Sequence, residues 1–540
     1  MPARTCNVLL IHPRFGANTF WNFAAACELF GARYPTGPLG LITVAALLPS
    51  TWCVRLVDRN VEELTDGDLA WADLVMTGGM LPQQYDLLNV IDLCRARAKP
   101  VAIGGPAATS TPEIYARADF RILGEAEGII DKFIAAWEAG EREGVFEAEK
   151  FKIDVTNSPI PRFDLLKFEN YLYIGVQFSR GCPFTCEFCD IIELYGRVPR
   201  TKTNAQMLTE LEALYRLGYR GHVDFVDDNL IGNKKGVKAF LPDLREWQKA
   251  HDYPFEFTTE ASINLADDPE LLRLMNEANF VGVFVGIESP DPDTLVAMRK
   301  KQNTRRNLVE SIQRIYAAGL FVTGGFIVGF DSEKGSVADA MVDLIEDAAI
   351  PVCMVGLLYA LPNTQLTRRL TQEGRLHHRE YHESSHKGSA DHCTHGLNFD
   401  TLRPRQDILL DYKRVLEKAY DPLAFIGRIR RLVSLLDNST RKRKTQAEAS
   451  QRKYSSLETV HRLINSLPES GEVFWQTFID CARSNPASAR YVLMLMAFYL
   501  HLGPFSRYVI NEIEEKIEDI ETSDFSSRRP TDQPRPAVMM

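Results

Sequence analysis

The sequence has few cysteines and no long apolar run. Ten cysteines in 540 residues are far below the density of a disulfide-stabilised secreted domain. No stretch of about 18 uninterrupted apolar residues occurs, so we expect no membrane span. Residues 1–6 lead into a short apolar segment that ends at His12 and Pro13, which is too brief for a signal peptide. These absences predict a cytoplasmic protein, with peripheral membrane contact as the remaining alternative.

Excess positive charge is also missing. The chain has 62 Lys and Arg against 72 Asp and Glu, a net charge of −10, so no global basic field attracts nucleic acid. The short basic runs at 428–431 and 441–444 are better explained by solvated helix faces or a linker. We therefore expect no nucleic-acid partner. The length is too great for one hydrophobic core and suggests three or four units.

Strands and helices alternate over residues 1–146, which we interpret as the first domain. This order predicts a doubly wound parallel sheet, in which ligands approach the carboxyl ends of the strands. Residues 147–172 carry Pro159 and Pro161 without a sustained period and are interpreted as a linker. We expect strands at residues 7–11, 53–57, 74–77, 100–103 and 120–123. We expect helices at residues 39–48, 85–98 and 126–139.

A second alternating series fills residues 173–362. Its six strands, separated by helices, predict a partial (β/α)6 barrel with an active site at the carboxyl ends of the strands. The expected strands lie at 173–178, 222–226, 255–259, 282–287, 321–328 and 352–359.

The remaining chain is mainly helical over 363–520 and has the composition of a disordered tail over 521–540. Residues 377–395 contain six of the eleven histidines together with Cys393. Some are four residues apart and could bind a metal from one helix face. The surrounding Arg, Glu, Ser and Lys residues favour instead an exposed loop that caps a substrate cavity.

Three cysteines form a compact CxxxCxxC loop directly after the first strand of the second series. Cys182, Cys186 and Cys189 would present three thiolates, the ligands that iron–sulfur clusters require. Three ligands for four irons leave one iron open for an amino acid's amino and carboxylate groups. The alternative is structural zinc, which needs a fourth ligand such as Asp190 or a remote histidine. No second CxxC or HxxxH lies nearby, and this favours a 4Fe–4S cluster.

The cysteine loop on the first strand of a six-stranded barrel resembles the radical S-adenosylmethionine superfamily. This resemblance implies that later strand ends bind S-adenosylmethionine. Asp227, Asp228 and Asn229 correspond to the segment that meets the methionyl amino group. Glu260 corresponds to the polar residue that meets the ribose.

The remaining barrel motifs fit the same resemblance. Glu288 and Ser289 end the fourth strand in the form usual for the cobalamin-binding branch of that superfamily. Phe188 would shield the cluster or pack against the adenine. The fifth strand carries a GxIxG-like element that packs on adenine, formed by Gly325, Ile327 and Gly329.

Loops of the first domain resemble the cobalamin-binding domains of that branch. Glycines past the strand ends would let the backbone approach cobalamin closely. Residues 35–40 belong to the same resemblance. The DxHxxG motif that gives cobalt a histidine is missing, so cobalt lacks such a ligand, His12 replaces it, or the cofactor is lost. The residues implied to contact cobalamin are Gly78, Gly79, Met80, Gly104, Gly105, Pro106, Gly124 and Glu125.

The strongest overall resemblance is to cobalamin-binding radical methylases, including hopanoid C-2 methylases and bacteriochlorin side-chain methylases. It implies methylation of an unactivated carbon of a small or hydrophobic substrate, such as a hopanoid-like lipid or a tetrapyrrole. The reaction would begin with reductive cleavage of S-adenosylmethionine, so a flavodoxin or ferredoxin is the implied reducing partner. Two alternatives stay open: a non-methylating radical cyclase or rearrangement enzyme, and a non-catalytic cobalamin or iron–sulfur sensor.

Overall fold

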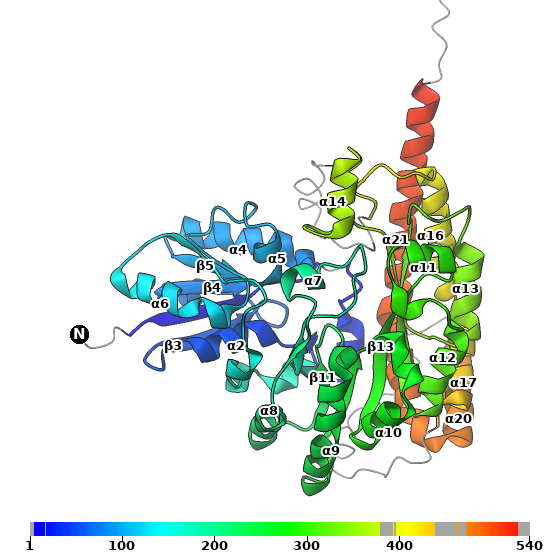
Figure 1. Ribbon diagram of the computed structural model, residues 1–540, viewed down its shortest axis with the longest axis horizontal. Coiled ribbons are helices and arrows are strands. Elements are labelled where there is room, and N and C mark those ends of the chain that lie inside the picture. The colour runs from blue at the N-terminus through cyan, green and yellow to red at the C-terminus, as the bar shows by residue number, and fades with distance from the viewer. Residues whose placement is uncertain are drawn as a thin grey trace, which may run out of the picture.

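The computed structural model describes residues 5–16, 18–377, 393, 396–437, 462–463 and 471–527. In Figure 1 an α/β domain, coloured blue to cyan, lies beside a curled sheet with its helices in green. Helices coloured yellow to red cover the side of the barrel away from that domain. This arrangement confirms the expected α/β fold with a mainly helical carboxyl-terminal extension.

The first domain is built on six parallel strands in the order β3-β1-β4-β5-β6-β7. Alternate residues of β1 enter opposite cores, with Leu9 and Ile11 on one face and Val8 and Leu10 on the other, as a sheet covered on both faces requires. The sixth strand, β7, was not expected. The strands are β1 (Asn7–His12), β3 (Cys53–Asp58), β4 (Leu74–Gly78), β5 (Val101–Gly104), β6 (Phe120–Leu123) and β7 (Gly144–Glu147). The helices are α2 (Leu39–Leu47), α3 (Asp66–Trp71), α4 (Gln84–Ala96), α5 (Gly105–Ser110) and α6 (Ile130–Ala139).

The barrel sheet has seven parallel strands in the order β15-β14-β13-β12-β11-β8-β2. All six expected strands are present. They are β8 (Tyr171–Val176), β11 (Gly221–Phe225), β12 (Phe255–Glu260), β13 (Phe280–Glu288), β14 (Phe321–Val328) and β15 (Cys353–Leu357). The helices between them are α7 (Ile191–Leu194), α8 (Asn204–Arg216), α9 (Lys234–Ala250), α10 (Pro269–Glu277), α11 (Pro292–Ala297), α12 (Leu308–Ala317) and α13 (Ala338–Asp347).

The seventh barrel strand, β2 (Tyr34–Thr36), comes from the first 40 residues of the chain. It pairs with β8 and so corrects the expected six-stranded sheet and the assignment of residues 35–40 to the first domain. Phe20 and Phe30 beside it are buried in the barrel core, as are residues of α1 (Ala24–Leu29). Pro35 removes one backbone donor, which an edge strand tolerates. Residues 20–36 therefore cover an edge of β8 that would otherwise be open.

Five long helices complete the described chain: α14 (Gln365–Gln372), α16 (Arg405–Ala419), α17 (Pro422–Leu435), α20 (Gly471–Ser484) and α21 (Ala489–Ser527). Helix α21 continues through residues 521–527, which corrects the start of the expected tail; residues 528–540 and most of 377–395 lie outside the described residues. The segment Pro486–Thr522 passes a length and hydropathy test for a membrane span, but 56% of its apolar window is buried inside the protein. That is weak evidence for a span.

Candidate active site

The cysteine loop is closed by a short antiparallel pair. Strand β9 (Ser179–Arg180) pairs with β10 (Arg200–Thr201) on either side of the loop. The Cys182 amide donates to the Gly196 carbonyl at 3.2 Å. Gly181 has φ +95°, and a β-carbon there would lie 2.9 Å from the Gly196 oxygen. Only glycine fits this turn, which leads directly into the first thiol.

Two amide side chains point at the thiols. Asn229 Nδ2 lies 3.8 Å from Cys182 Sγ, and Gln302 Nε2 lies 3.7 Å from Cys186 Sγ. Burial raises the pKa of Cys182, and the pKa of Cys189 rises well above its ordinary value for the same reason. N–H donors and a bound metal offset this cost because they stabilise the thiolate form. No sequence motif indicated Gln302, which follows the fourth strand rather than ending it.

After burial, the charge of Cys186 also contributes to the raised pKa of Cys182 and of Cys189, so the three thiols lie near one another. Within the described ranges, no three His, Cys, Asp or Glu side chains converge closely enough to ligate a single metal ion. Tetrahedral zinc requires that convergence, whereas each thiolate of a cluster binds a different iron. Together with the amide donors, this arrangement fits a 4Fe–4S cluster on Cys182, Cys186 and Cys189.

The Asp227–Asp228 pair anchors the loop. Asp227 is fully buried, and its two oxygens accept from the backbone amides of Phe178 at 3.0 Å and Ser179 at 2.5 Å. Asp228 Oδ2 accepts from the Gly181 amide at 2.8 Å, and burial raises the pKa of Asp228 to about 7. Asp227 therefore positions the cysteine loop, which differs from the expected direct contact with a methionyl amino group.

Glu260 ends β12, and its side chain lines the cavity of the barrel. Removal from bulk water, followed by the charges of Asp224, Asp228 and Asp227, raises the pKa of this carboxyl to about 8. A carboxyl with this pKa is mostly protonated at neutral pH and can donate a hydrogen bond as well as accept one. This is the strand end at which the resemblance implies a ribose contact.

Glu288 ends β13 at φ +68° and forms an ion pair with Lys300, Oε1 to Nζ 2.6 Å. Lys300 is buried, which lowers the pKa of its amine, but Glu288 and then Cys186 raise that pKa above its usual value. The cation therefore lies close to the cysteine loop, at a residue the sequence did not indicate. Ser289 Oγ accepts from the Asp291 amide at 3.2 Å, so this hydroxyl shapes the turn.

The GxIxG-like segment of β14 is held by packing that excludes side chains. A β-carbon at Gly325 would lie 3.0 Å from the ring of Phe284. Gly329 has φ +107°, and its amide donates to Glu333 Oε1 at 2.9 Å. Ile327, between them, is half-buried. Backbone free of side chains at a strand end is what the flat face of an adenine requires.

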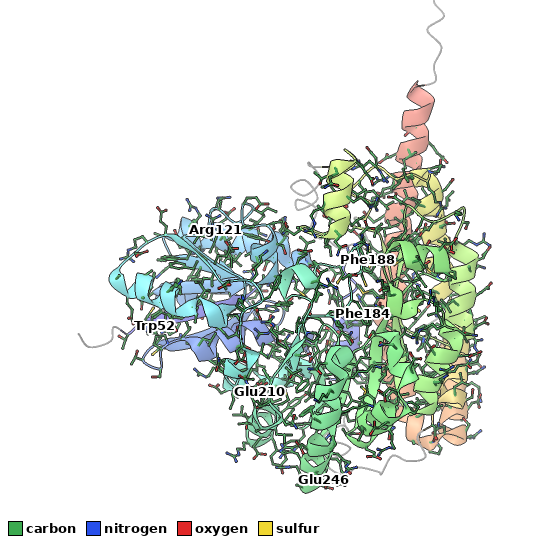
Figure 2. All side chains as sticks on the ribbon, in the orientation of Figure 1. Trp52, Arg121, Phe184, Phe188, Glu210 and Glu246 are labelled. Carbon is green, nitrogen blue, oxygen red and sulfur yellow. The ribbon has the colours of Figure 1, made fainter. Side chains whose placement is uncertain are left out.

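Phe188 comes to the same end of the barrel. Its ring meets Phe330 edge to face, with centroids 5.9 Å apart, and Lys300 Nζ lies 5.8 Å from its centroid. Figure 2 shows Phe184 and Phe188 between the first domain and the carboxyl-terminal helices. This position fits the expected role of Phe188 in shielding the cluster or packing on adenine.

Glycines of the first domain let its strand ends approach one another. A β-carbon at Gly78 would lie 2.8 Å from the Gly104 oxygen, and one at Gly104 would lie 3.0 Å from the Ile122 oxygen. Gly105, at φ +85°, turns the chain into α5, where Pro106 occupies the first turn. These positions therefore shape the edge itself, whatever ligand it accepts.

The remaining loop residues leave part of that edge accessible. Met80 is 46% exposed, and Gly79 before it carries no side chain. Gly124, at φ +83°, donates its amide to Thr109 Oγ1 at 2.9 Å. His12 ends β1 with Nδ1 buried and without a hydrogen-bond partner among the described residues, and burial lowers the pKa of the ring. A side-chain-poor edge with a neutral imidazole fits a flat corrin.

Glu125 has a different role from the expected cobalamin contact. Its carboxylate pairs with Arg180 at 3.0 Å and with Arg200 at 2.8 Å, and Arg180 also pairs with Glu127 at 2.7 Å. Burial alone would raise the pKa of Glu127, but the hydrogen bond and charge of Arg180 lower it to about 2. This buried network, here named the domain clamp, joins the first domain to the strand pair that frames the cysteine loop.

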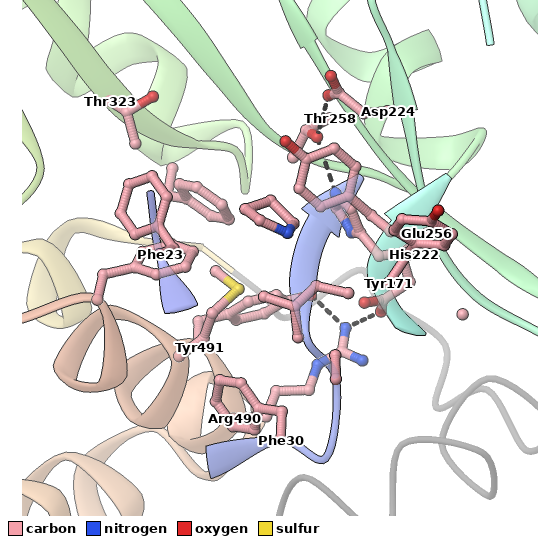
Figure 3. Close-up of a pocket in the computed structure, with 18 of the residues that line it drawn as sticks. Phe23, Phe30, Tyr171, His222, Asp224, Glu256, Thr258, Thr323, Arg490 and Tyr491 are labelled. Atoms are coloured by element: carbon pink, nitrogen blue, oxygen red, sulfur yellow. Dashed lines mark hydrogen bonds and ion pairs between the residues drawn. The ribbon is translucent and has the colours of Figure 1, made fainter. Parts of the chain in front are cut away.

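A cavity of about 970 Å³ occupies the barrel interior below this site. It extends from Glu260 to the amino ends of the strands, where residues 20–35 and the start of α21 close it. Figure 3 shows Asp224 linked to Thr258, at 2.5 Å, and His222 Nε2 linked to the same hydroxyl, at 2.8 Å. Glu256 pairs with Arg490 of α21. The sequence did not predict this closure, because its two segments lie more than 450 positions apart.

Comparison with known proteins places these features in a family. Residues 176–345 match the radical SAM superfamily model, and residues 364–515 match a domain of unknown function, DUF4070. An uncharacterized methyltransferase of Synechocystis sp. is 44% identical over 519 residues, covering 95% of this chain and 94% of the relative. Hopanoid C-2 methylase of Rhodopseudomonas palustris is 38% identical over 427 residues, 78% of each chain.

A solved structure has the same fold. It is the cobalamin-dependent S-adenosylmethionine radical enzyme OxsB with aqua-cobalamin and S-adenosylmethionine bound. It aligns at a TM-score of 0.59 and 14% identity, covering 98% of this chain and 82% of that chain. The full-length relatedness, the thiol loop and the two-domain architecture agree: the chain belongs to the radical S-adenosylmethionine superfamily, in the branch of cobalamin-dependent methyltransferases.

Proposed function

We propose that the protein methylates an unactivated carbon of a hydrophobic small molecule that occupies the barrel cavity. The observation that carries this proposal is the position of Glu260, which belongs to the strand-end site and also lines the cavity. A substrate there would lie beside the site of radical formation. One relative is named hopanoid C-2 methylase, and that name supports a hydrophobic substrate.

The chain's own residues have separable tasks in this proposal. Cys182, Cys186 and Cys189 would hold the cluster, and Asp228 and Glu260 would meet S-adenosylmethionine. When bound, these cofactors and cobalamin supply a 5′-deoxyadenosyl radical and a methyl donor. The walls of the barrel and the first domain exclude water from the reacting atoms. Free thiols throughout the described chain favour a reducing, cytoplasmic compartment with a flavodoxin or ferredoxin as electron donor.

Lys300 and the domain clamp position these parts. Lys300 neutralises Glu288 beside the thiols, where an unpaired carboxylate would repel a cluster of thiolates. The domain clamp fixes the glycine-rich edge of the first domain against the loop that carries the cysteines. Fixed spacing between these two parts is what two cofactors acting on one substrate require.

The test is anaerobic reconstitution of the full chain with iron, sulfide and cobalamin, followed by reductant and S-adenosylmethionine. We expect 5′-deoxyadenosine by mass spectrometry from the wild type and none from the Cys182→Ala, Cys186→Ala, Cys189→Ala triple variant. Cys53→Ala, at an exposed thiol of the first domain, is the matched control and should retain formation of the nucleoside.

The same experiment separates the alternatives. Nucleoside together with a product heavier by one methyl group supports the proposal. Nucleoside with a product of unchanged carbon count would favour a cyclase or rearrangement enzyme. An intact cluster that never forms the nucleoside would favour a sensor.

A further inference from the structure

Two carboxyls on the inner wall of the cavity, those of Asp224 and Glu260, have no ion-pair partner among the described residues. Asp224 and Thr258 lie on the neighbouring strands β11 and β12, and the Thr258 hydroxyl donates to one oxygen of Asp224 at 2.5 Å. The other oxygen of Asp224 has no hydrogen-bond partner among the described residues. The carboxyl of Glu260, two residues after Thr258 on β12, also has none among them. Both carboxyls line the open space of the cavity, so a ligand there can donate hydrogen bonds to them.

The cationic side chains that line the cavity already have partners within the protein. The described lining includes two arginines. Arg490 pairs with Glu256, and Arg220 donates to the carbonyls of Tyr215 and Tyr219 while it stacks on the Tyr215 ring. Burial lowers the pKa of His222 to about 4, so this imidazole is neutral near pH 7. An anionic group in the cavity would meet arginines that already have partners and would face the carboxyl of Asp224.

The remaining walls are apolar and aromatic. Phe23 and Phe30 come from the amino-terminal segment, and Met494 and Phe498 come from α21. Figure 3 shows these two sources facing the polar wall of β11 and β12 across the cavity. A cavity of about 970 Å³ is at the upper end of the range for small-molecule sites. One polar wall facing apolar and aromatic walls therefore suits a large apolar ligand with a polar group on one side.

We propose that Asp224 and Thr258 form a donor-recognition subsite, which selects a large apolar substrate bearing hydroxyl or ammonium groups and rejects one bearing a carboxylate or phosphate. This rests on the proposed function, since it names the substrate class of the same cavity. It narrows that class, because acidic lipids and tetrapyrroles that would place a carboxylate in the cavity are excluded. The subsite holds the polar group on β11 and β12 and so orients the hydrocarbon body toward Glu260 and the cysteine end.

The test measures binding on the full chain without reductant or S-adenosylmethionine. N-phenyl-1-naphthylamine, a neutral apolar dye, is displaced by decan-1-ol, decylamine or decanoate, which share one chain and differ in head group. We expect that displacing half of the dye takes at least about tenfold more decanoate than decan-1-ol or decylamine, because burying an anion beside a carboxylate is unfavourable. Equal displacement by decanoate would overturn the proposal.

Two variants assign the effect to this cavity. Met494→Trp should fill the space and weaken dye binding at least tenfold, whereas Leu410→Trp, at an exposed position of α16, should leave it unchanged. Unchanged binding in Met494→Trp would contradict the location.

Asp224→Asn should reduce several-fold the preference of the protein for decan-1-ol and decylamine over decanoate. Circular dichroism should show that the fold of this variant is intact. A greater loss for decylamine than for decan-1-ol supports an ammonium group, and equal losses support a hydroxyl. An unchanged affinity of Asp224→Asn for both decylamine and decan-1-ol would contradict the subsite. Failure of nucleoside formation leaves these binding results standing, so the two proposals fail separately.

Discussion

The carboxyl end of the barrel is assembled from residues that directly follow its own strands, whereas the amino end is closed by segments from both ends of the chain. At the carboxyl end, the cysteine loop, Asp228 and Glu260 carry thiol and carboxyl chemistry within short local motifs. At the amino end, residues 20–35 and the start of α21 supply aromatic rings and one ion pair. In the proposed function the first end holds the cofactors and the second holds the substrate, so a variant can disable one end and leave the other intact.

The largest expected effect breaks the carboxyl end alone. Cys186→Ala should remove the cluster, because two thiolates cannot retain four irons against loss in solution. We expect loss of the iron–sulfur absorbance and of 5′-deoxyadenosine down to background, with dye binding in the cavity unchanged. A variant that lost both functions equally would show that the two ends do not separate.

The difference between the two ends also explains what the sequence could predict. The strand at Phe321–Val328 was predicted to the residue, and Cys182, Cys186 and Cys189 were found from spacing, because a strand and the loop after it are local. The contact between α1 and α21 depends on pairing of distant apolar faces, which periodicity cannot assign. Strand β2 escaped prediction for the same reason, since three residues with a proline carry almost no strand signal.

Side-chain partners were the other limit. The sequence placed Asp227 and Glu125 at the correct strand ends but could not show that backbone amides and arginines already use their oxygens. Both carboxylates position the cysteine loop. Asp227 accepts hydrogen bonds from the backbone just before the loop, and Glu125 pairs from the first domain with the arginines on either side of it. A strand-end carboxylate can therefore support a site as well as contact a ligand, and only its hydrogen bonds distinguish the two.

Asp227→Asn should give the next largest effect. One amide N–H would oppose the backbone N–H groups of Phe178 or Ser179 that now donate to the carboxylate, at a cost of about 2–3 kcal/mol. Iron per chain after reconstitution should fall severalfold, and the urea midpoint should drop. Asp92→Asn, at an exposed ion pair, is the control. Full iron content in Asp227→Asn would refute the anchoring role.

Arg490→Met tests the amino end. It leaves Glu256, which is buried, without its cation, and an unpaired buried charge costs about 3–5 kcal/mol. Dye affinity should fall about tenfold as the start of α21 loosens, while iron content stays at the wild-type level. Arg483→Met, at an exposed position, should change neither. Glu256→Gln in the Arg490→Met background should restore part of the affinity, and no restoration would contradict the ion-pair explanation.

The smallest expected effect is a change in pH dependence. Because the pKa of Glu260 is raised to about 8 from an ordinary 4.5, the folded protein keeps a proton that the unfolded chain releases between these values. The free energy of unfolding should therefore fall as pH rises through this window. Glu260→Gln should flatten that slope in urea titrations of the apo-protein at several pH values. Identical slopes would show that Glu260 is not held protonated.

The most direct test of the account is electron paramagnetic resonance of the reduced, reconstituted protein before and after addition of S-adenosylmethionine. Three protein thiolates leave one iron of a four-iron cluster without a protein ligand. We expect a 4Fe–4S signal whose g values shift when S-adenosylmethionine is added. A signal that does not respond, or a chain that retains zinc in place of iron, would contradict it.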